Sequence, residues 1–300
     1  MSDSTASVTV RQLIEQGAQS FEAARLWFGH GTDNAFDEAA ELVFFGAGLR
    51  HEDAPAVYDM PLDAERRTRV LELFDRRVRE RVPAAYLTHR MWFAGHEFYV
   101  DQRVLVPRSP IAELIEARYE PWIDARSIER VLDIGTGSGC IAIASALALP
   151  DARVDAVDIS EDALAVTEIN IARYDLRGRV RAICSDVFEA LADERYDVIV
   201  SNPPYVGDEE LATLPTEYER EPRLGLHGGC DGLDIVRRIL REARSHLTPR
   251  GILIVEVGNS EDALVEAYPE VPFTWLEFER GGGGVFLLTA AQLDEMRAQL

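Results

Sequence analysis

Hydrophobic and polar positions divide the chain into two parts with different periodicities. Over residues 9–81, apolar residues recur with near-helical spacing, in runs at 13–28, 36–49 and 62–82 that are separated by polar breaks. Helices of this length and amphipathic character predict a small helical bundle over residues 1–84.

An aromatic-rich stretch follows the helical part. Residues 91–100 read Met-Trp-Phe-Ala-Gly-His-Glu-Phe-Tyr-Val, and apolar residues resume at 103–106 after Asp101 and Gln102. This pattern predicts two strands joined by a turn at Asp101 and Gln102, and hence a β-hairpin between two domains. The predicted organisation is a helical domain at 1–84, a hairpin at 85–108 and a larger domain at 109–300.

The larger domain alternates between the two periodicities. Strands are predicted at 130–134, 153–157, 180–184, 196–200 and 251–257, and helices at 111–119, 139–149, 161–174 and 233–247. Segments 273–278 and 285–289 are predicted as a closing antiparallel pair, with the glycines at 281–284 as a flexible tip between them. The alternation predicts an α/β fold with a mostly parallel sheet and helices on both faces.

A glycine-rich turn follows the first strand of the alternating part. It begins at Asp133 and contains Gly135, Thr136, Gly137 and Gly139. Glycines let the backbone approach a ligand closely, and the N-terminus of the next helix offers free N–H groups. The Gly-x-Gly-x-Gly spacing differs from the Gly-x-Gly-x-x-Gly spacing of dinucleotide-binding folds, so the turn does not quite match the motif that binds pyrophosphate.

Acidic residues follow the next two strands. Asp158 can accept both hydroxyls of a ribose, and Asp186 can accept an adenine amine, with Val187 and Phe188 as apolar neighbours. Ligands bind such sheets at the carboxyl ends of the strands, so the glycine turn and the two acids are expected in one site. Helix capping or loop solvation is the alternative for either acid. Together with the turn, they favour S-adenosylmethionine as the ligand.

The tetrapeptide Asn202-Pro203-Pro204-Tyr205 follows the strand at 196–200. An amide nitrogen is a poor nucleophile, and two oxygens that accept its N–H groups would hold it and stabilise the charge that develops on it. Asn202 offers a side-chain oxygen and Pro203 a carbonyl without a competing N–H. The prolines make the loop rigid, and Tyr205 offers an aromatic face. The motif favours methyl transfer to an amide or exocyclic amine; a stiff loop without function is the alternative.

Charge and cysteine content indicate the type of binding partner and the cellular compartment of the protein. The formal net charge is −22, from 53 acidic and 31 basic residues, and the sequence contains no lysine. Such a chain suits a basic protein better than bare nucleic acid, although acidity can also serve solubility alone. Cys140, Cys184 and Cys230 lack metal-ligand spacing, which predicts no metal site and a reducing compartment. With no signal-peptide pattern and no membrane-spanning stretch, we expect a cytoplasmic protein.

The chain resembles the HemK-like protein-(glutamine-N5) methyltransferases over nearly its whole length. The segments that carry the resemblance are 84–88, 93–100, 104–110, 132–143, 200–206, 217–222, 224–226, 229–233 and 256–259. The resemblance implies a seven-stranded Rossmann-like, class I S-adenosylmethionine-dependent methyltransferase domain, preceded by a small helical domain for substrate recognition and a linking β-hairpin.

The resemblance also implies site residues. Those for the donor S-adenosylmethionine are Asp133, Gly135, Gly137, Asp158, Asp186 and Asn202. The glycine turn adds Thr136 and Gly139 to the expected donor site, and the neighbour of Asp186 adds Val187. Those for the substrate are Asn202, Pro203, Pro204 and Tyr205, of which Asn202, Pro203 and Tyr205 are expected to be catalytic.

The family has two well-known branches. One methylates the Gly-Gly-Gln glutamine of peptide-chain release factors, and the other a glutamine of large-subunit ribosomal protein L-three. Arg108-Ser109-Pro110 stands where the release-factor branch usually carries Arg-Pro-Asp-Thr-Glu, and residues 92–100 and 271–278 resemble the ribosomal-protein branch. We therefore expect methylation of ribosomal protein L-three, a basic partner, before its assembly.

Three other functions remain open. They are release-factor methylation, N6-adenine methylation of nucleic acid, and donor binding without catalysis. The intact motif at 202–205 favours an enzyme, and the acidic charge disfavours nucleic acid.

Charged residues outside the motifs carry less specific expectations. Arg108 and Glu113 either shape the rim of the pocket or form a capping or surface pair. Glu219 and Glu221 are expected in a solvated loop, with contact to a basic substrate as the alternative. His96 is expected to be structural.

Overall fold

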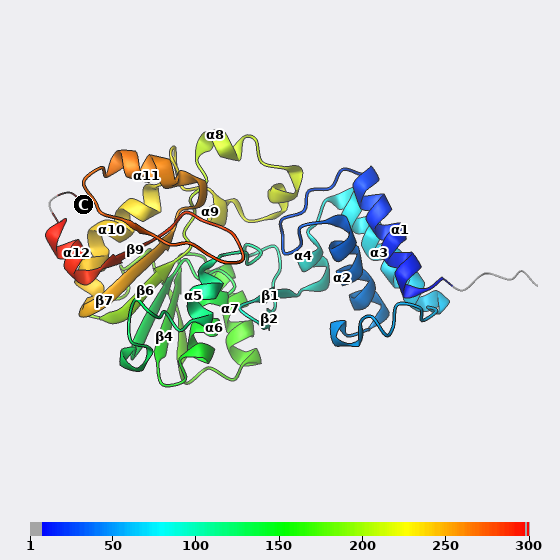
Figure 1. The fold of residues 1–300 in the computed structure, drawn as a ribbon, viewed down its shortest axis with the longest axis horizontal. Coiled ribbons are helices and arrows are strands. Elements are labelled where there is room, and N and C mark those ends of the chain that lie inside the picture. Colours follow the sequence, from blue (N-terminus) through cyan, green and yellow to red (C-terminus); the bar gives the residue numbers. More distant parts are fainter. Residues whose placement is uncertain (1–7, 298, 300) are drawn as a thin grey trace, which may run out of the picture. The chain divides into compact units, whose positions relative to one another are not determined.

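The computed structural model describes residues 8–297 and 299, which fall into two compact units. The helical unit comprises the described residues up to Arg90 together with Pro215–Arg220. The sheet unit comprises Met91–Leu214 and the described residues from Glu221 onward. Figure 1 follows the chain through both units in colours from blue to red. The predicted domain boundaries at residues 84 and 108 stay predictions.

The helical unit is built on α1 (Val10–Ala23), α2 (Ala35–Ala47), α3 (Ala64–Glu80) and α4 (Ala84–Thr88), with short 3-10 helices at His51–Asp53 and Thr216–Arg220. Thr9, Asn34 and Asp63 cap the three long helices, because each side chain accepts the backbone N–H three residues later. α1 ends before the predicted residue 28, since Arg25 adopts a left-handed φ of 50°.

Apolar faces of the long helices form the core of the helical unit. Leu13, Phe21, Leu42 and Phe44 are at most 1% exposed. The rings of Phe21 and Phe74 meet edge to face with centroids 5.2 Å apart. The periodicity that predicted the bundle therefore marks its buried face.

The linking hairpin is shorter than predicted. β1 (Met91–Phe93) pairs antiparallel with β2 (His96–Phe98). The turn lies at Ala94 and Gly95, with φ of 47° and 76°, which are the two positive values that a tight two-residue hairpin turn requires.

The predicted second strand of the hairpin, at 103–106, is wrong. A turn does form at Asp101, whose carbonyl accepts the N–H of Val104 at 3.1 Å. The N–H of Arg103 donates to the Asp101 carboxylate at 3.0 Å, and that of Val106 donates to the carboxylate of Glu221 at 2.9 Å. Side chains thus take the N–H groups that a strand partner would need.

The sheet unit contains the elements that the alternating pattern predicted, with several short helices in addition. Its strands are β3 (Arg130–Ile134), β4 (Arg153–Asp158), β5 (Val180–Cys184), β6 (Tyr196–Ser201), β7 (Leu247–Glu256), β8 (Thr274–Trp275) and β9 (Val285–Thr289). Its helices are α5 (Ile111–Glu116), α6 (Cys140–Ala148), α7 (Glu161–Arg173), α8 (Asp208–Leu211), α9 (Arg223–Leu226), α10 (Asp234–His246), α11 (Glu261–Ala267) and α12 (Ala290–Glu295), with 3-10 turns at Ala125–Ser127 and Gly258–Ser260.

The strands form one seven-stranded sheet in the order β5-β4-β3-β6-β7-β9-β8. The first five of these are parallel, and β9 runs antiparallel to both β7 and β8. The predicted α/β fold and closing antiparallel pair are confirmed. Of the predicted strand at 273–278, only two residues are strand.

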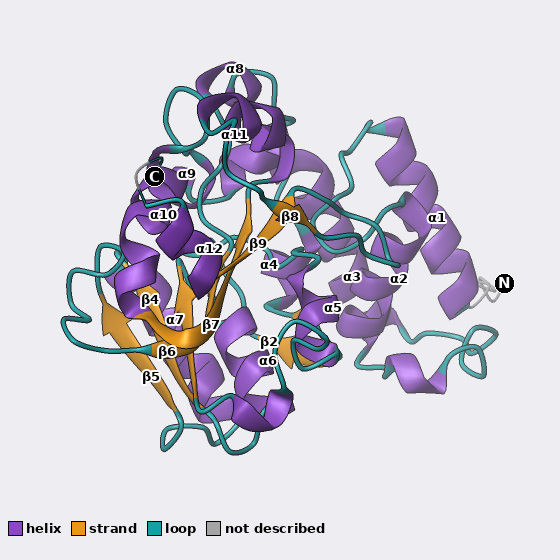
Figure 2. Cartoon of the chain, turned by 60° about the vertical axis from the view of Figure 1, so that its left-hand side comes forward, coloured by secondary structure: helices purple, strands orange, loops and turns teal. Residues whose placement is uncertain are grey.

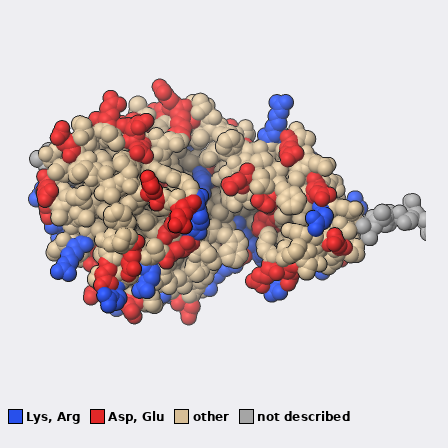
Figure 3. All heavy atoms as spheres, viewed as in Figure 1, with Lys and Arg blue, Asp and Glu red and all other residues tan. Residues whose placement is uncertain are grey.

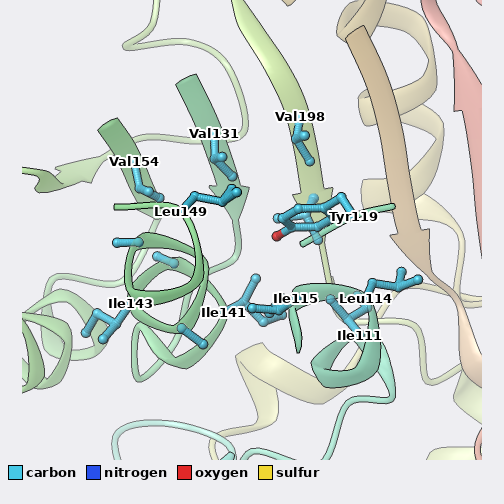
Figure 4. Packing of buried hydrophobic residues seen from close by; sticks show 14 of the residues in the cluster. Ile111, Leu114, Ile115, Tyr119, Val131, Ile141, Ile143, Leu149, Val154 and Val198 are labelled. Carbon is cyan, nitrogen blue, oxygen red and sulfur yellow. The ribbon is translucent and has the colours of Figure 1, made fainter. Parts of the chain in front are cut away.

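Helices cover both faces of the sheet, as Figure 2 shows. Alternate residues of each strand point to opposite faces. Val131 packs in the layer that includes Ile115 and Ile141 of α5 and α6 (Figure 4). Its neighbour Leu132 packs in the other layer, against residues that include Leu240 of α10. Strands buried on both faces read as continuous apolar runs, which made them recognisable in the sequence.

Candidate active site

Two loops meet at the carboxyl ends of β3 and β6. These strands are adjacent and parallel, with their last residues paired. The glycine turn (residues 135–139) leaves β3, and the Asn-Pro-Pro-Tyr loop (residues 202–205) leaves β6. A Cβ placed on Gly135 would lie 3.8 Å from the carbonyl oxygen of Asn202. The strand order reverses between β3 and β6, which is where open α/β sheets bind ligands.

The glycine turn adopts a conformation that suits glycine at three positions. The φ angles of Gly135, Gly137 and Gly139 are 72°, 55° and 80°. The N–H groups of Gly135 and Thr136 both donate to the carbonyl of Val157, at 2.9 Å. A Cβ on Gly137 would meet no atom within 4 Å, so the turn faces open space there.

Two side chains of α7 hold the glycine turn. The hydroxyl of Thr167 donates to the carbonyl of Gly137 at 2.8 Å, and Nδ2 of Asn170 donates to that of Ser138 at 2.9 Å. Both side chains are fully buried. This role could not be predicted from the sequence, since a polar residue inside a helix has many possible partners.

Asp133 is a buried carboxylate beside the turn. It lies within β3, and its Oδ2 accepts the Thr136 hydroxyl at 2.6 Å and the Ala142 N–H at 3.1 Å. Its Oδ1 has no hydrogen-bond partner among the described residues. Burial raises the pKa of Asp133 to about 7, although its two hydrogen bonds act in the opposite direction.

Asp158 is the last residue of β4 and contacts the same turn. Its Oδ2 accepts the N–H of Gly137 and its Oδ1 that of Ser160, each at 2.9 Å. Burial raises the pKa of Asp158, and these backbone donors partly offset that effect. The neighbouring Ile159 is 52% exposed, which leaves an apolar surface at the end of β4. Of the two acids predicted after β4 and β5, Asp158 is thus hydrogen-bonded directly to the glycine turn.

Asp186 lies after β5 and is already paired. Its Oδ1 accepts from Nη1 of Arg238 on α10 at 2.6 Å. Val187 follows with a left-handed φ of 53°, an unusual conformation for a β-branched residue. The role of both residues in adenine binding stays a prediction, and Arg238 is a neighbour that the sequence did not indicate.

The Asn-Pro-Pro-Tyr loop presents unused acceptors. Neither the side chain of half-buried Asn202 nor the carbonyl of buried Pro203 forms a hydrogen bond with any described residue. The loop is fixed beyond the motif, because the N–H of Val206 donates to Leu226 at 2.9 Å and the Val206 carbonyl accepts from Gly228 at 3.0 Å. The loop can therefore offer two oxygens to a ligand without rearranging hydrogen bonds.

Tyr205 is held by residues that the sequence analysis did not assign to the site. Its hydroxyl donates to Oε1 of Glu256 at 3.0 Å, and its carbonyl accepts from the hydroxyl of Ser260 at 2.8 Å. A Cβ on Gly258 would lie 2.5 Å from the Tyr205 ring, so the ring packs against the Gly258 backbone. In the sequence, the run Glu256-Val257-Gly258 contributes only to the family resemblance.

The expectations for the other charged residues need correction. Glu221 is 5% exposed rather than solvated, and its carboxylate accepts from both Nη atoms of Arg108, at 2.7 and 2.8 Å. Arg108 therefore does not pair with Glu113, which instead accepts from the backbone N–H groups of Glu279 and Arg280 and from Nε of Arg280. Glu219 is exposed, as expected.

The surface carries both signs of charge. On the face in Figure 3, acidic side chains are widespread and basic ones lie among them without a continuous basic stripe. Among the described residues, no helix combines the length and apolar character needed to cross a membrane.

Comparisons with known proteins agree with this geometry. A family model described as "Methyltransferase small domain" matches residues 121–216. Two curated proteins named "Ribosomal protein uL3 glutamine methyltransferase" are similar to the chain. The one from Xanthomonas campestris pv. campestris is 52% identical over 95% of this chain and 92% of its own, and the one from Bordetella pertussis is 48% identical over 95% and 96%.

Among solved structures, the hMettl16 catalytic domain in complex with a 3′UTR hairpin matches with a TM-score of 0.50 and 17% identity. The match covers 76% of this chain and 81% of that one. At this identity the likeness speaks for the fold alone, which is that of class I methyltransferases.

Proposed function

The chain belongs to the family of ribosomal protein uL3 glutamine methyltransferases, and we propose that it transfers a methyl group from S-adenosylmethionine to the side-chain amide nitrogen of one glutamine in uL3. The chain is a methyltransferase, and its family membership rests on about half of its residues being identical to those of relatives over nearly their whole length.

One observation carries the proposal. The glycine turn and the Asn-Pro-Pro-Tyr loop lie side by side, with the Gly135 Cβ position 3.8 Å from the Asn202 carbonyl. A donor held by the first loop would therefore have its reactive end beside the acceptor atoms of the second. Approach of the two reactants in a fixed orientation is a large part of what an enzyme supplies to such a reaction.

The residues around the glycine turn suit S-adenosylmethionine. Oδ1 of Asp133 is a buried acceptor without a partner in the described chain, and Gly137 faces open space. Asp158 and the exposed apolar Ile159 lie together at the end of β4, where a ribose and an adenine ring could be covered. We propose that the donor is held by Asp133, Gly135, Thr136, Gly137, Gly139, Asp158, Asp186, Val187 and Asn202.

The Asn-Pro-Pro-Tyr loop would bind the glutamine amide. Oδ1 of Asn202 and the carbonyl of Pro203 would each accept one N–H of the amide, which fixes its plane and turns the nitrogen lone pair toward the donor. Pro204 and the ring of Tyr205 would pack against the planar group. Because both acceptors are free of other hydrogen bonds in the described structure, binding costs no internal bond.

Methyl transfer needs little further chemistry from the chain. The bound donor would supply an electrophilic methyl carbon on a sulfonium. Attack by the amide nitrogen on that carbon would form the carbon–nitrogen bond while the carbon–sulfur bond breaks, with the electron pair of the broken bond going to sulfur. The two oxygens at Asn202 and Pro203 stabilise the positive charge that develops on nitrogen. The cationic amide formed by methylation would be strongly acidic and lose one N–H proton to water, which leaves the neutral N-methyl amide.

Charge supports a basic partner. The net charge of −22 would attract a basic ribosomal protein and speed its encounter with the enzyme. We propose that uL3 is modified in the cytoplasm before it is assembled, when its glutamine is accessible. The three cysteines are all free, in keeping with a reducing compartment.

The test is methyl transfer from labelled S-adenosylmethionine to three purified acceptors in parallel. They are free uL3, a peptide-chain release factor and unmethylated DNA, each with an Asn202→Ala control and with mass spectrometry to locate the label. We expect label on a glutamine of uL3 that is lost in the control. Label on the release factor alone, or on DNA alone, would replace the proposed substrate while leaving the chemistry of the loop in place.

A further inference from the structure

Glu256 is a buried carboxylate at the end of β7 that lies behind the Asn-Pro-Pro-Tyr loop. It is 5% exposed, and each of its two carboxylate oxygens accepts a hydrogen bond from one hydroxyl group. Oε1 accepts from Tyr205 at 3.0 Å, and Oε2 accepts from Ser109 at 2.5 Å. Glu256 forms no ion pair with any described residue, and the nearby Arg108 is engaged by Glu221.

A carboxylate in this position opposes folding. Burial raises the pKa of Glu256 to about 7, although the two hydroxyls and the charge of Arg108 act in the opposite direction. An apolar side chain of similar size would fill the same space without that cost. A carboxylate has one property that an apolar residue lacks here, because it can accept from two hydroxyl groups at once and so fix both.

The two hydroxyls belong to different parts of the sheet unit. Ser109 is 7% exposed and precedes α5, where its oxygen also accepts the N–H of Ile111 at 3.2 Å. Tyr205 belongs to the Asn-Pro-Pro-Tyr loop, and its ring packs against Gly258. Glu256 thus joins the start of a packed helix to an aromatic ring of the candidate substrate site.

We propose that Glu256 is a positioning residue for methyl transfer, which fixes the ring of Tyr205 through its hydroxyl and is itself fixed by Ser109. The inference rests on the proposed function in that Tyr205 packs against the amide that is methylated. With the hydroxyl anchored, the ring is held at one angle. Without the anchor, the ring can rotate away from the amide, while the donor site at the glycine turn is unchanged.

The main test is a double-mutant cycle with Glu256→Met, which removes both acceptor oxygens, and Tyr205→Phe, measured as kcat and KM for uL3 and as the Kd of S-adenosylhomocysteine. We expect each single variant to lower kcat about 10-fold with the Kd within about 2-fold, since a small displacement of a positioning group is enough for such a loss. Because both changes break the same link, the double variant should be no slower than the slower single variant. Losses that multiply to about 100-fold would overturn the proposal.

Two further variants separate positioning from folding. Ser109→Ala keeps the bond between Glu256 and Tyr205, and we expect a loss of about 3-fold that vanishes in the Tyr205→Phe background. Glu266→Gln, on the exposed face of α11, is the matched control and should leave kcat unchanged. If Glu256→Met does not fold, the same cycle with Ser109→Ala decides the question, and a loss that persists without the Tyr205 hydroxyl would contradict the proposal.

A measurement on the protein without a methyl-accepting substrate tests this inference independently of the proposed function. Fluorine NMR of protein labelled with fluorotyrosine would report on the ring directly, with the Tyr205 signal identified by its loss in Tyr205→Phe. We expect this signal to shift and broaden in Glu256→Met, which leaves the Tyr205 hydroxyl without this acceptor. An unchanged signal would refute the link even if uL3 is methylated, whereas an altered signal would support it even if the acceptor proves to be another protein.

Discussion

Glu217 offers the sharpest test of how the helical unit is held together. It follows Tyr205 of the Asn-Pro-Pro-Tyr loop by 12 residues in the sequence but belongs to the helical unit, where it is 2% exposed. Its Oε1 accepts the backbone N–H of Trp27 at 3.1 Å, Nη1 of Arg81 at 3.1 Å and Nη1 of Arg77 at 3.5 Å. We predict that replacing Glu217 destabilises this unit selectively.

The magnitude follows from the burial of its partners. Arg77 and Glu38 are fully buried, and Nε of Arg77 donates to Oε1 of Glu38 at 2.6 Å. Without Glu217, buried Arg77 keeps Glu38 but loses its second carboxylate, and Arg81 loses its ion pair with Glu217. Breaking a buried pair costs ~3–5 kcal/mol. For Glu217→Ala we therefore expect the free energy of unfolding to fall by about 3 kcal/mol or more. Glu217→Gln keeps an acceptor for the Trp27 N–H but loses the charge, for which we expect about 2 kcal/mol.

The assay combines urea unfolding with hydrogen exchange read by mass spectrometry. We expect faster exchange in α1 and α3 and unchanged exchange in β3, β6 and β7, because the lost contacts all lie in the helical unit. Glu219→Gln is the matched control, since Glu219 is exposed two residues away and should change stability by less than about 0.5 kcal/mol. Equal effects of the two variants, or increased exchange spread evenly over both units, would refute the reasoning.

The remaining predictions concern the candidate active site. Asn202→Ala should lower kcat at least about 100-fold with the Kd of the donor nearly unchanged, measured by methyl transfer and calorimetry. Asp158→Asn should weaken donor binding about 10-fold in calorimetry, because it removes a charged acceptor beside the glycine turn. Gly258→Ala places a Cβ 2.5 Å from the Tyr205 ring at a φ of 47°, so kcat should fall about 10-fold or more while donor binding persists. Burial raises the pKa of Glu256 from 4.5 to about 7. Between pH 4.5 and about pH 7 the folded state therefore binds more protons than the unfolded state, and the free energy of unfolding falls as pH rises through this range. At about 1.4 kcal/mol per unit this amounts to roughly 3 kcal/mol, and urea unfolding of wild type and Glu256→Gln at about pH 5 and about pH 8 should show the wild type losing more.

Local patterns predicted the elements of the sheet well. Strands such as β3 are buried on both faces, so their apolar runs between turn residues identify them without knowledge of their partners. The hairpin shows where local pattern fails. Asp101 does make a turn, but whether residues 103–106 form a strand depends on a partner, and the N–H of Val106 goes instead to the distant Glu221.

Residues with a local signature could be found in the sequence, and residues that act across space could not. The glycine turn and the Asn-Pro-Pro-Tyr loop each have a recognisable spacing, and their proximity follows from the strand order. Glu256 and Thr167 have no such signature, because each meets its partner only when strands or helices far apart in the sequence pack together. The membership of Pro215–Arg220 in the helical unit is of the same kind, since Glu217 and Trp27 are 190 residues apart.

The sheet places a buried acid on each side of the strand that carries the Asn-Pro-Pro-Tyr loop. β6 lies between β3 and β7, and Asp133 and Glu256 lie near the carboxyl ends of these two strands. Burial raises the pKa of both carboxyls to about 7, so both oppose folding near neutral pH. Asp133 binds the Thr136 hydroxyl of the glycine turn, and Glu256 binds the Tyr205 hydroxyl of the neighbouring loop. Departures from a stable apolar core are expected at functional sites. Here each buried acid holds the loop on its own side of the candidate active site.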